Sequence, residues 1–318
     1  AAVPGGVIPW PAGAAGAAAL VVAAGAAVLA VRVPRATTLV AAVTAVVVVL
    51  VALPRPGSAR WPPPGWLAVA CDVGQGDALV LADGEGAGVV VDAGPDPDAV
   101  DRCLRDLGVS RVPAVVLTHF HADHVEGLTG VLAGRSVGEV VVSPLREPAD
   151  EAERVSTWAD AAGVPVRTAA VGETVDAGTV RWRVLWPARL LRSDGSPPNN
   201  ASVVLLVEAA GRRLLLGGDL EPAAQSALER LEPPLAADLI KVPHHGSRRQ
   251  EPGFAAWSGA RLALVSVGRD NDYGHPAPAT LAAYAEAGIA VARTDTGGDL
   301  AVVDVAGALT VVARGPPG

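Results

Sequence analysis

The chain has 318 residues, enough for one large domain and an additional segment. Residues 1–65 contain four arginines and no carboxylate, so all 33 acidic side chains but only 21 of the 25 basic ones belong to the rest. Such an acidic body excludes broad DNA binding by phosphate neutralisation alone, although bound metal ions can supply positive potential locally. Because the sequence contains no methionine, we expect it to be an excerpt from a longer protein.

Residues 1–53 are predicted to contain two membrane-spanning helices. Residues 12–31 and Thr37–Leu53 are almost entirely apolar, and each approaches the roughly 20 residues needed to cross a bilayer. Two tandem stretches joined by the short charged link Arg32–Arg35 do not fit a signal peptide. Two arginines follow each stretch, so charge does not decide their orientation. Residues 54–65 are rich in proline and are predicted to form a semi-rigid linker.

Residues 66–318 alternate short β runs with helical stretches, an order that two sheets sandwiched between helices explain. Strands are predicted at Leu67–Asp72, Ala78–Ala82, Gly88–Asp92, Ala114–Thr118, Val137–Val142, Val180–Leu185, Ser202–Glu208, Arg213–Leu216, Leu239–Val242, Leu262–Ser266, Leu300–Asp304 and Leu309–Ala313. Helices are predicted at Pro97–Leu107, Val125–Ala133, Asp150–Ala162, Pro222–Leu231 and Ala277–Glu286.

The two cysteines, Cys71 and Cys103, do not form a CxxC pair, so the sequence does not support a thiolate metal site. The simplest interpretation is that both are small buried residues. A disulfide between them is the alternative if the domain lies outside the cell, where such bonds persist.

Three of the six histidines fall within residues 118–124, which read THFHADH. The segment follows an apolar strand and precedes a helical stretch, so a loop can bring its side chains together. His119 and His121 alternate and project to one side, with Asp123 and His124 close behind. Imidazoles and a carboxylate at this spacing suit zinc or manganese, so the segment predicts a metal site.

This segment resembles the H-x-H-x-D-H signature of the metallo-β-lactamase superfamily. The resemblance implies an αββα sandwich in which His119 and His121 hold one divalent ion, while Asp123 and His124 hold a second. Asp219 ends the apolar strand LLLGGD and is similar to the aspartate that bridges the two ions. Of the pair His244–His245, we expect His244 to complete the second site and His245 to face the substrate.

One departure from the superfamily pattern concerns the first ion. The usual pattern has another histidine before the bridging aspartate, but here none occurs between His124 and His244. In the corresponding region Asn200 or Ser202 could supply an oxygen ligand, or a water could take the position. An oxygen ligand favours manganese over zinc. The alternative is that Asn199 and Asn200 form an ordinary turn.

A narrower resemblance concerns the substrate. The segment ACDVGQGDAL at 70–79 resembles the motif that opens the hydrolase domain of the ComEC family of DNA-uptake membrane proteins. Val89–Gly94 and Tyr273–Pro276 are similar to later motifs of that family. The resemblance implies a multi-pass membrane protein whose external domain degrades DNA during natural transformation. DNA, the membrane and other uptake components are its implied partners, and no small organic cofactor is expected.

Further roles are assigned to residues around the expected metal site. Asp92 is expected to orient a ligand histidine through its free N–H. Asp77 or His275 is expected to protonate the leaving oxygen. Asp123 and His245 are the other expected catalytic residues. Ser247 and Arg248 are candidate phosphate contacts, whereas the other arginine pairs, Arg181/Arg183 and Arg212/Arg213, fit a solvated face.

Two other functions remain open on the sequence. The chain could be a surface esterase acting on phosphocholine or teichoic acid groups. It could also be a non-catalytic domain that binds DNA or gates a channel, for which the missing histidine is the motivating observation.

Overall fold

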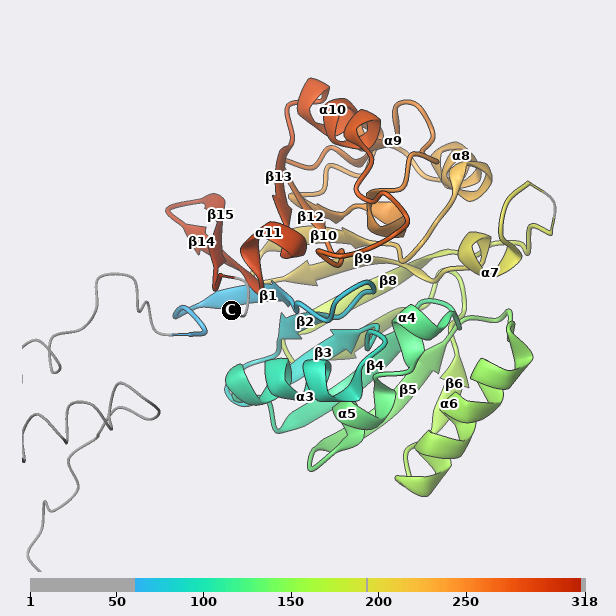
Figure 1. Cartoon of the computed structure of the whole chain (residues 1–318), viewed down its shortest axis with the longest axis vertical. Coiled ribbons are helices and arrows are strands. Elements are labelled where there is room, and N and C mark those ends of the chain that lie inside the picture. The colour runs from blue at the N-terminus through green and yellow to red at the C-terminus, as the bar shows by residue number, and fades with distance from the viewer. Residues whose placement is uncertain (1–60, 193, 316–318) are drawn as a thin grey trace, which may run out of the picture. The chain divides into compact units, whose positions relative to one another are not determined.

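The computed structural model describes residues 61–192 and 194–315. Two β-sheets face each other, and helices cover their outer faces (Figure 1). The predicted sandwich of two sheets between helices is therefore confirmed. The two spanning helices predicted within residues 1–53 lie outside the described residues, as does most of the predicted linker. Within the described part of the chain, no helix is long and apolar enough to span a membrane.

The first sheet has eight strands in the order β15-β14-β1-β2-β3-β4-β5-β6. Its central strands are apolar on both faces, because each face is covered. The strands are β1 (Trp66–Ala70), β2 (Leu79–Ala82), β3 (Gly88–Val91), β4 (Arg111–Leu117), β5 (Ser136–Val142), β6 (Val166–Thr168), β14 (Leu300–Val305) and β15 (Ala308–Ala313).

The second sheet has seven strands in the order β13-β12-β11-β10-β9-β8-β7. Strands β10 to β13 run parallel to one another, so their carboxyl ends lie at one edge. The strands are β7 (Thr174–Ala177), β8 (Val180–Trp186), β9 (Val204–Ala209), β10 (Arg212–Leu216), β11 (Leu239–Lys241), β12 (Leu262–Val265) and β13 (Ala290–Arg293).

Three apolar clusters hold the layers together. One lies between the sheets, where Leu81, Val116 and Trp182 are almost fully buried. The outer clusters lie under the helices of each sheet. The helices are α3 (Pro97–Asp106), α4 (Ala122–Val125), α5 (Leu128–Leu132), α6 (Ala149–Ala161), α7 (Pro197–Asn200), α8 (Pro222–Leu231), α9 (Phe254–Ser258), α10 (Pro278–Glu286) and α11 (Thr294–Gly297), with the 3₁₀ turn η2 (Pro243–Gly246).

All twelve predicted strands and four of the five predicted helices are present. The exception is the helix predicted at Val125–Ala133, which is divided into α4 and α5 around Gly127. A Cβ on Gly127 would stand 1.9 Å from the carbonyl oxygen of Ala93, so this glycine brings the chain against the loop after β3. Strands β6, β7 and β13 were not predicted; they are short, and each of them lies at the end of a sheet.

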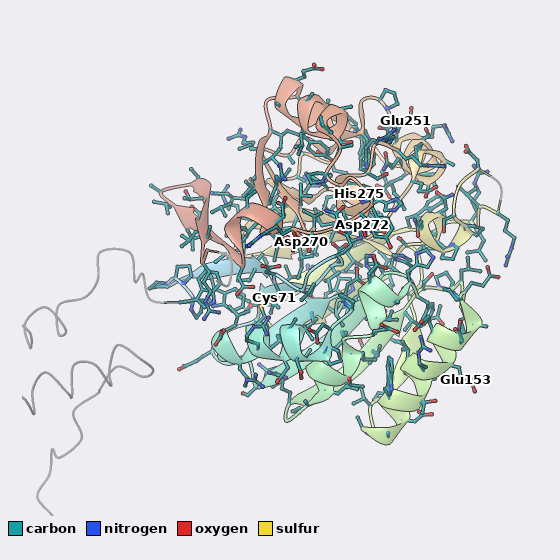
Figure 2. The ribbon with its side chains drawn as sticks, in the orientation of Figure 1. Cys71, Glu153, Glu251, Asp270, Asp272 and His275 are labelled. Atoms are coloured by element: carbon teal, nitrogen blue, oxygen red, sulfur yellow. A yellow bond between two sulfur atoms is a disulfide. The ribbon has the colours of Figure 1, made fainter. Side chains whose placement is uncertain are left out.

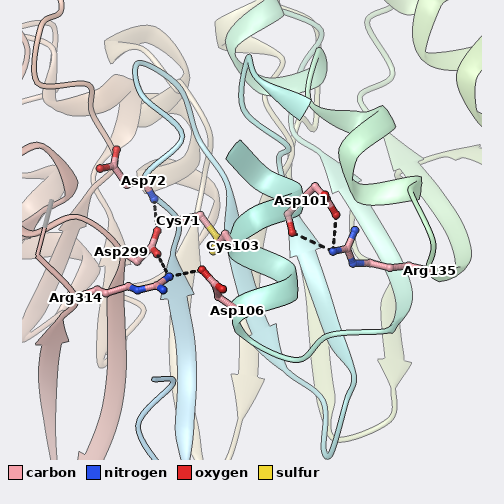
Figure 3. The surroundings of a disulfide bond; sticks show 8 residues. All are labelled: Cys71, Asp72, Asp101, Cys103, Asp106, Arg135, Asp299 and Arg314. Carbon is pink, nitrogen blue, oxygen red and sulfur yellow. Dashed lines mark hydrogen bonds and ion pairs between the residues drawn. A yellow bond between two sulfur atoms is a disulfide. The ribbon is translucent and has the colours of Figure 1, made fainter. Parts of the chain in front are cut away.

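The cysteines form a disulfide between the end of β1 and α3 (Figure 3). Both residues are buried, as predicted, and the alternative of a covalent bond between them is the one that the structure shows. Close by, the backbone N–H of Asp72 donates to Asp299, and Arg314 pairs with Asp299 and Asp106. The disulfide therefore anchors the start of the segment that leads to Asp77.

Candidate metal centre

Four side chains from three loops converge at one edge of the sandwich. Asp123 and His124 belong to α4, which follows β4, while Asp219 follows β10 and His245 lies in η2 after β11. Their ligand atoms all lie within 4.8 Å of one another. His124, Asp219 and His245 are buried, whereas the side chain of Asp123 is 32 % exposed. The cluster therefore has one partly open side.

The distances within this cluster fit one divalent ion. His245 Nε2 lies 3.2 Å from Asp123 Oδ2 and 3.4 Å from Asp219 Oδ2. His124 Nε2 lies 3.3 Å from Asp219 Oδ1 and 3.7 Å from Asp123 Oδ2. Atoms that each bind a tetrahedral ion at typical zinc distances stand about 3.4 Å apart. His124 Nε2 and Asp219 Oδ1 are also buried without a hydrogen-bond partner, as expected of ligand atoms.

The far nitrogens of both imidazoles have partners that fix the ring orientation. His124 Nδ1 lies 2.9 Å from Asp92 Oδ2, and His245 Nδ1 lies 2.9 Å from the carbonyl oxygen of Ser266. A proton on Nδ1 leaves the lone pair of Nε2 directed at the cluster. Asp92 is itself held by the N–H and hydroxyl of Thr118, at 2.7 and 2.8 Å. Asp92 thus occupies the position expected of a residue that orients a ligand histidine.

The charges of the cluster are mutually dependent. Although burial lowers it, the carboxylates of Asp219 and Asp123 raise the pKa of His124 well above its usual value. His245 follows the same pattern, with Asp219 as its main charged partner. Although burial raises it, His245 and His124 hold the pKa of Asp219 well below the usual range. A divalent ion would take the place of the protons that these imidazoles otherwise carry.

The pair His244–His245 is placed in the opposite order to the expectation. His245 is 1 % exposed and lies in the cluster, whereas His244 is beside it, with Nε2 3.7 Å from Asp219 Oδ2. Both residues have a φ of 51°, which is unusual for non-glycine residues and is found mainly at functional sites. This backbone separates the two rings by 6.2 Å and turns them 74° apart.

Glu221 is a buried residue of the site that the sequence analysis missed. Its carboxylate lies 3.8 Å from His244 Nδ1 and accepts hydrogen bonds from the N–H of Ser196 and the side-chain amide of Asn199. Arg249 also pairs with it, at 3.1 Å. The spacing Asp219-x-Glu221 was the available signal, because the second carboxylate comes directly before a helix. Glu221 ties His244 to the loop that contains α7.

His119 and His121 form a second group of imidazoles. His119 Nε2 lies 3.0 Å from His121 Nδ1, so the two nitrogens face a common point. Burial is the main cause that lowers the pKa of both rings, which keeps them neutral and available as ligands. The ring of His119 also lies 4.2 Å from that of His124, so this pair of imidazoles adjoins the four-residue cluster.

The two candidate oxygen ligands for this second group lie elsewhere. Ser202 Oγ is 3.4 Å from His119 Nδ1, the nitrogen opposite the one that faces His121, and it accepts the N–H of Asp219 at 3.2 Å. Ser202 therefore positions two expected ligands. Asn200 directs its amide to the carbonyl of Asp194 and lies in the short turn α7, as the alternative of an ordinary turn predicted.

Asp77 lies behind the cluster and not on its open side. It is fully buried, with Oδ1 3.3 Å from His245 Nδ1 and Oδ2 3.7 Å from His124 Nδ1. Although burial raises it, the charges of Lys241 and His245 keep the pKa of Asp77 below its ordinary value. The structure thus places Asp77 next to the Nδ1 atoms of both imidazoles and in an ion pair with Lys241, a position that fits a role in orienting the two rings.

Lys241, the only lysine of the chain, is the second residue that the sequence analysis missed. It is 2 % exposed, forms an ion pair with Asp77 and donates a hydrogen bond of 2.8 Å to the carbonyl of Gly218. Its Nζ also lies 3.6 Å from Asp219 Oδ1. A lysine inside the apolar strand β11 was the available signal, since buried lysines are nearly always paired.

The remaining candidates lie at the edge of the centre or away from it. The ring of His275 is 5.4 Å from that of His244, and burial together with the charges of His244 and His245 lowers the pKa of His275 to about 4. His275 is therefore a neutral imidazole at neutral pH. Ser247 is buried and its hydroxyl accepts the N–H of Arg249, whereas Arg248 is exposed.

The arginines of the other predicted clusters are mostly ion-paired. Arg181 pairs with Asp176, Arg183 with Glu232, and Arg212 with Asp238 and Asp304. These pairs agree with the solvated faces expected for such residues. Next to the histidine pair, Arg248 and Arg249 are both exposed, and Arg249 pairs with Glu221.

Comparison with known proteins relates this centre to a family. The sequence model of the Metallo-beta-lactamase superfamily matches residues 71–251. ComE operon protein 3 of Bacillus subtilis (strain 168) is 30% identical over 200 residues, which cover 62% of this chain and 25% of that protein. The uncharacterized protein YcaI of Escherichia coli (strain K12) is 29% identical over 229 residues, which cover 67% of this chain and 27% of that protein.

The chain thus spans about a quarter of the length of these two relatives. Among solved structures, a mutant of the CmlA beta-hydroxylase has a TM-score of 0.50 at 12% identity, covering 79% of this chain and 54% of that one. This likeness shows the fold alone.

Proposed function

The chain belongs to the metallo-beta-lactamase superfamily of metal-dependent hydrolases, and from that premise we propose that it cleaves phosphodiester bonds in DNA at a cell surface. The observation that carries the proposal is the cluster of Asp123, His124, Asp219 and His245, with its four distances of 3.2 to 3.7 Å. The motifs similar to the ComEC family and the similarity to ComE operon protein 3 support DNA as the substrate.

The histidines and carboxylates of the centre are the proposed ligands of divalent metal ions. Asp123, His124, Asp219 and His245 would hold one divalent ion. By the superfamily resemblance, His119 and His121 would hold a second. Such ions supply positive charge to phosphate oxygens and lower the pKa of water that attacks phosphorus. Zinc and manganese both suit these imidazole and carboxylate ligands. Asp92 and the carbonyl of Ser266 fix the two ligand rings.

His244 and His275 lie beside the cluster: His244 Nε2 is 3.7 Å from Asp219 Oδ2, and the ring of His275 is 5.4 Å from that of His244. The pKa of each imidazole is lowered, and burial is the main cause, so both are neutral hydrogen-bond partners at neutral pH. A neutral imidazole carries one N–H, which it can donate to a phosphate oxygen. We assign both residues to substrate binding.

The disulfide supports a location outside the cytoplasm. Cys71 and Cys103 are the only cysteines of the chain, and structural disulfides persist in oxidising compartments. Together with the two spanning helices predicted within residues 1–53, this favours a multi-pass membrane protein with an external hydrolase domain. DNA and other components of an uptake machinery are its proposed partners.

The proposal is tested by incubating the chain with a single-stranded oligonucleotide and zinc, manganese or magnesium, while counting bound metal. We expect cleavage with zinc or manganese, and loss of both cleavage and metal in Asp219→Asn. Asp304→Asn changes a carboxylate on an exposed ion pair and is the matched control. An intact oligonucleotide in the presence of metal-loaded protein would contradict the proposal and would favour the non-catalytic binding domain.

A further inference from the structure

One exposed aromatic residue stands next to the metal centre without a role in packing. Tyr273 is 72 % exposed. The chain has just eleven phenylalanine, tryptophan and tyrosine residues, and the others within residues 61–192 and 194–315 are buried or half-buried. Hydrophobic burial therefore does not account for the position of this ring.

The ring of Tyr273 continues a series of rings that leads into the cluster. It stacks on His275 with a centroid distance of 5.9 Å and an interplanar angle of 29°. His275 in turn stacks on His245 at 6.3 Å and 26°. One face of Tyr273 is thus occupied by His275, and the residue's high exposure leaves the other face open to solvent. That open face is two ring spacings from a proposed metal ligand.

Hydrogen bonds fix the backbone of the loop between β12 and α10 on both sides of Tyr273. The side chain of Asn271 accepts the N–H of His275 and donates to the carbonyls of His275 and Gly268. The N–H of Gly268 donates to Gln75 in the segment before Asp77. A Cβ on Gly268 would stand 2.6 Å from the N of Gln75, so the two loops are in direct contact. A surface that is fixed before binding loses little entropy when a ligand stacks on it.

The charges around Tyr273 restrict what the open face can receive. Asp270 and Asp272 are exposed in the same loop, where Figure 2 shows them beside His275. Arg269 in the same loop is exposed too, so residues 269–272 carry a net charge of −1, which disfavours a phosphate over this ring. An uncharged nucleobase meets no such repulsion, and every base presents a flat face that stacks on an aromatic side chain.

We propose that Tyr273 is a stacking platform for an unpaired nucleobase next to the scissile phosphate, and that it determines the preference of the site for single-stranded nucleic acid. This inference rests on the proposed phosphodiesterase function and names a residue that selects the substrate. In a duplex each base is covered by its neighbours, so its face reaches Tyr273 only after the strand has been separated. Stacking of one base on an aromatic residue corresponds to about 5- to 150-fold in affinity.

The test compares two dye-labelled oligonucleotides of equal length, one of thymidines and one without bases, in binding to the 318-residue chain loaded with manganese. Both carry the same phosphates, so their affinity ratio isolates the contribution of the base. We expect the wild type to prefer the thymidine strand within the range given above. Tyr273→Phe should keep the ratio, whereas Tyr273→Ala should reduce it to near one. Leu231→Ala, which changes an exposed apolar residue at the end of α8, is the matched control and should keep it.

Three outcomes overturn the inference: equal affinity of the wild type for both strands, an unchanged ratio in Tyr273→Ala, or Tyr273-dependent binding of a choline phosphodiester in place of the bases. The last would indicate that the ring and the two carboxylates receive a quaternary ammonium group. Binding and cleavage separate the two proposals. A chain that prefers bases through Tyr273 but cleaves neither strand would support the platform and refute hydrolysis. A chain that cleaves both strands equally would support hydrolysis and refute the platform.

Discussion

Replacing Lys241 by methionine removes the positive charge that lies behind the metal centre. The side chains of Lys241 and Asp77 are 2 % and 1 % exposed, so Asp77 would be left as a buried carboxylate without its ion pair. The hydrogen bond of 2.8 Å to the carbonyl of Gly218 would be lost as well. Loss of one partner of a buried ion pair costs about 3–5 kcal/mol, a large part of the stability of an ordinary domain. For a domain of this size the cost corresponds to a fall in Tm of about 6–20 °C.

Thermal unfolding of the wild type and Lys241→Met, with a chelator present, measures this cost without a contribution from bound metal. Asp77→Asn and the double variant Asp77→Asn/Lys241→Met complete a double-mutant cycle. The double variant should be less destabilised than the two single variants added together, because it leaves no unpaired charge. Arg181→Met breaks an exposed ion pair with Asp176 and should leave the Tm unchanged.

A Lys241→Met protein that unfolds at the wild-type temperature would contradict a stabilising buried ion pair. A double variant whose loss of stability equals the sum of the two single losses would contradict the pair as well, because the two charges would then not depend on each other. Either result would mean that Asp77 is neutral in the folded protein or that water reaches the pair.

The other predictions concern the ligands and their surroundings. His245→Ala should lose the ion held with Asp219, whereas His244→Ala should keep the bound metal and weaken substrate binding. Metal analysis after dialysis distinguishes the two variants, and equal metal loss would contradict the assignment of His245 as the ligand. Asp92→Asn should lower metal affinity about 10- to 100-fold with the fold intact, as measured by competition with a chelating dye, and unaltered affinity would exclude an orienting role. The pKa of His275 is lowered to about 4, so the unfolded chain binds the extra proton between pH 6.5 and 4 and stability falls as the pH falls through this window. His275→Gln should flatten that part of the profile in urea unfolding of the metal-free chain, and a profile of unchanged slope would show that His275 does not cause it.

The sequence predicted His124 and Asp219 as ligands, because each follows an apolar strand and the ends of such strands meet at one edge of the sandwich. It could not order His244 and His245, since neighbouring residues exchange roles when the backbone adopts a positive φ, and both have a φ of 51°. The contacts of Asp77 with both imidazoles and with Lys241 could not be predicted either, because a motif does not tell which face of an imidazole a carboxylate meets. The division of the helix at Gly127 was likewise invisible, since it depends on a contact with Ala93 from another loop.

The burial of Lys241 also bears on chemical labelling. Because it is the only lysine in the sequence, no other ε-amino group can react with an acylating reagent, and this one is almost inaccessible in the folded domain. Modification at residue 241 would therefore occur only in molecules whose core has opened. The extent of acylation at this single position, read by mass spectrometry, would report local opening behind the metal centre in real time.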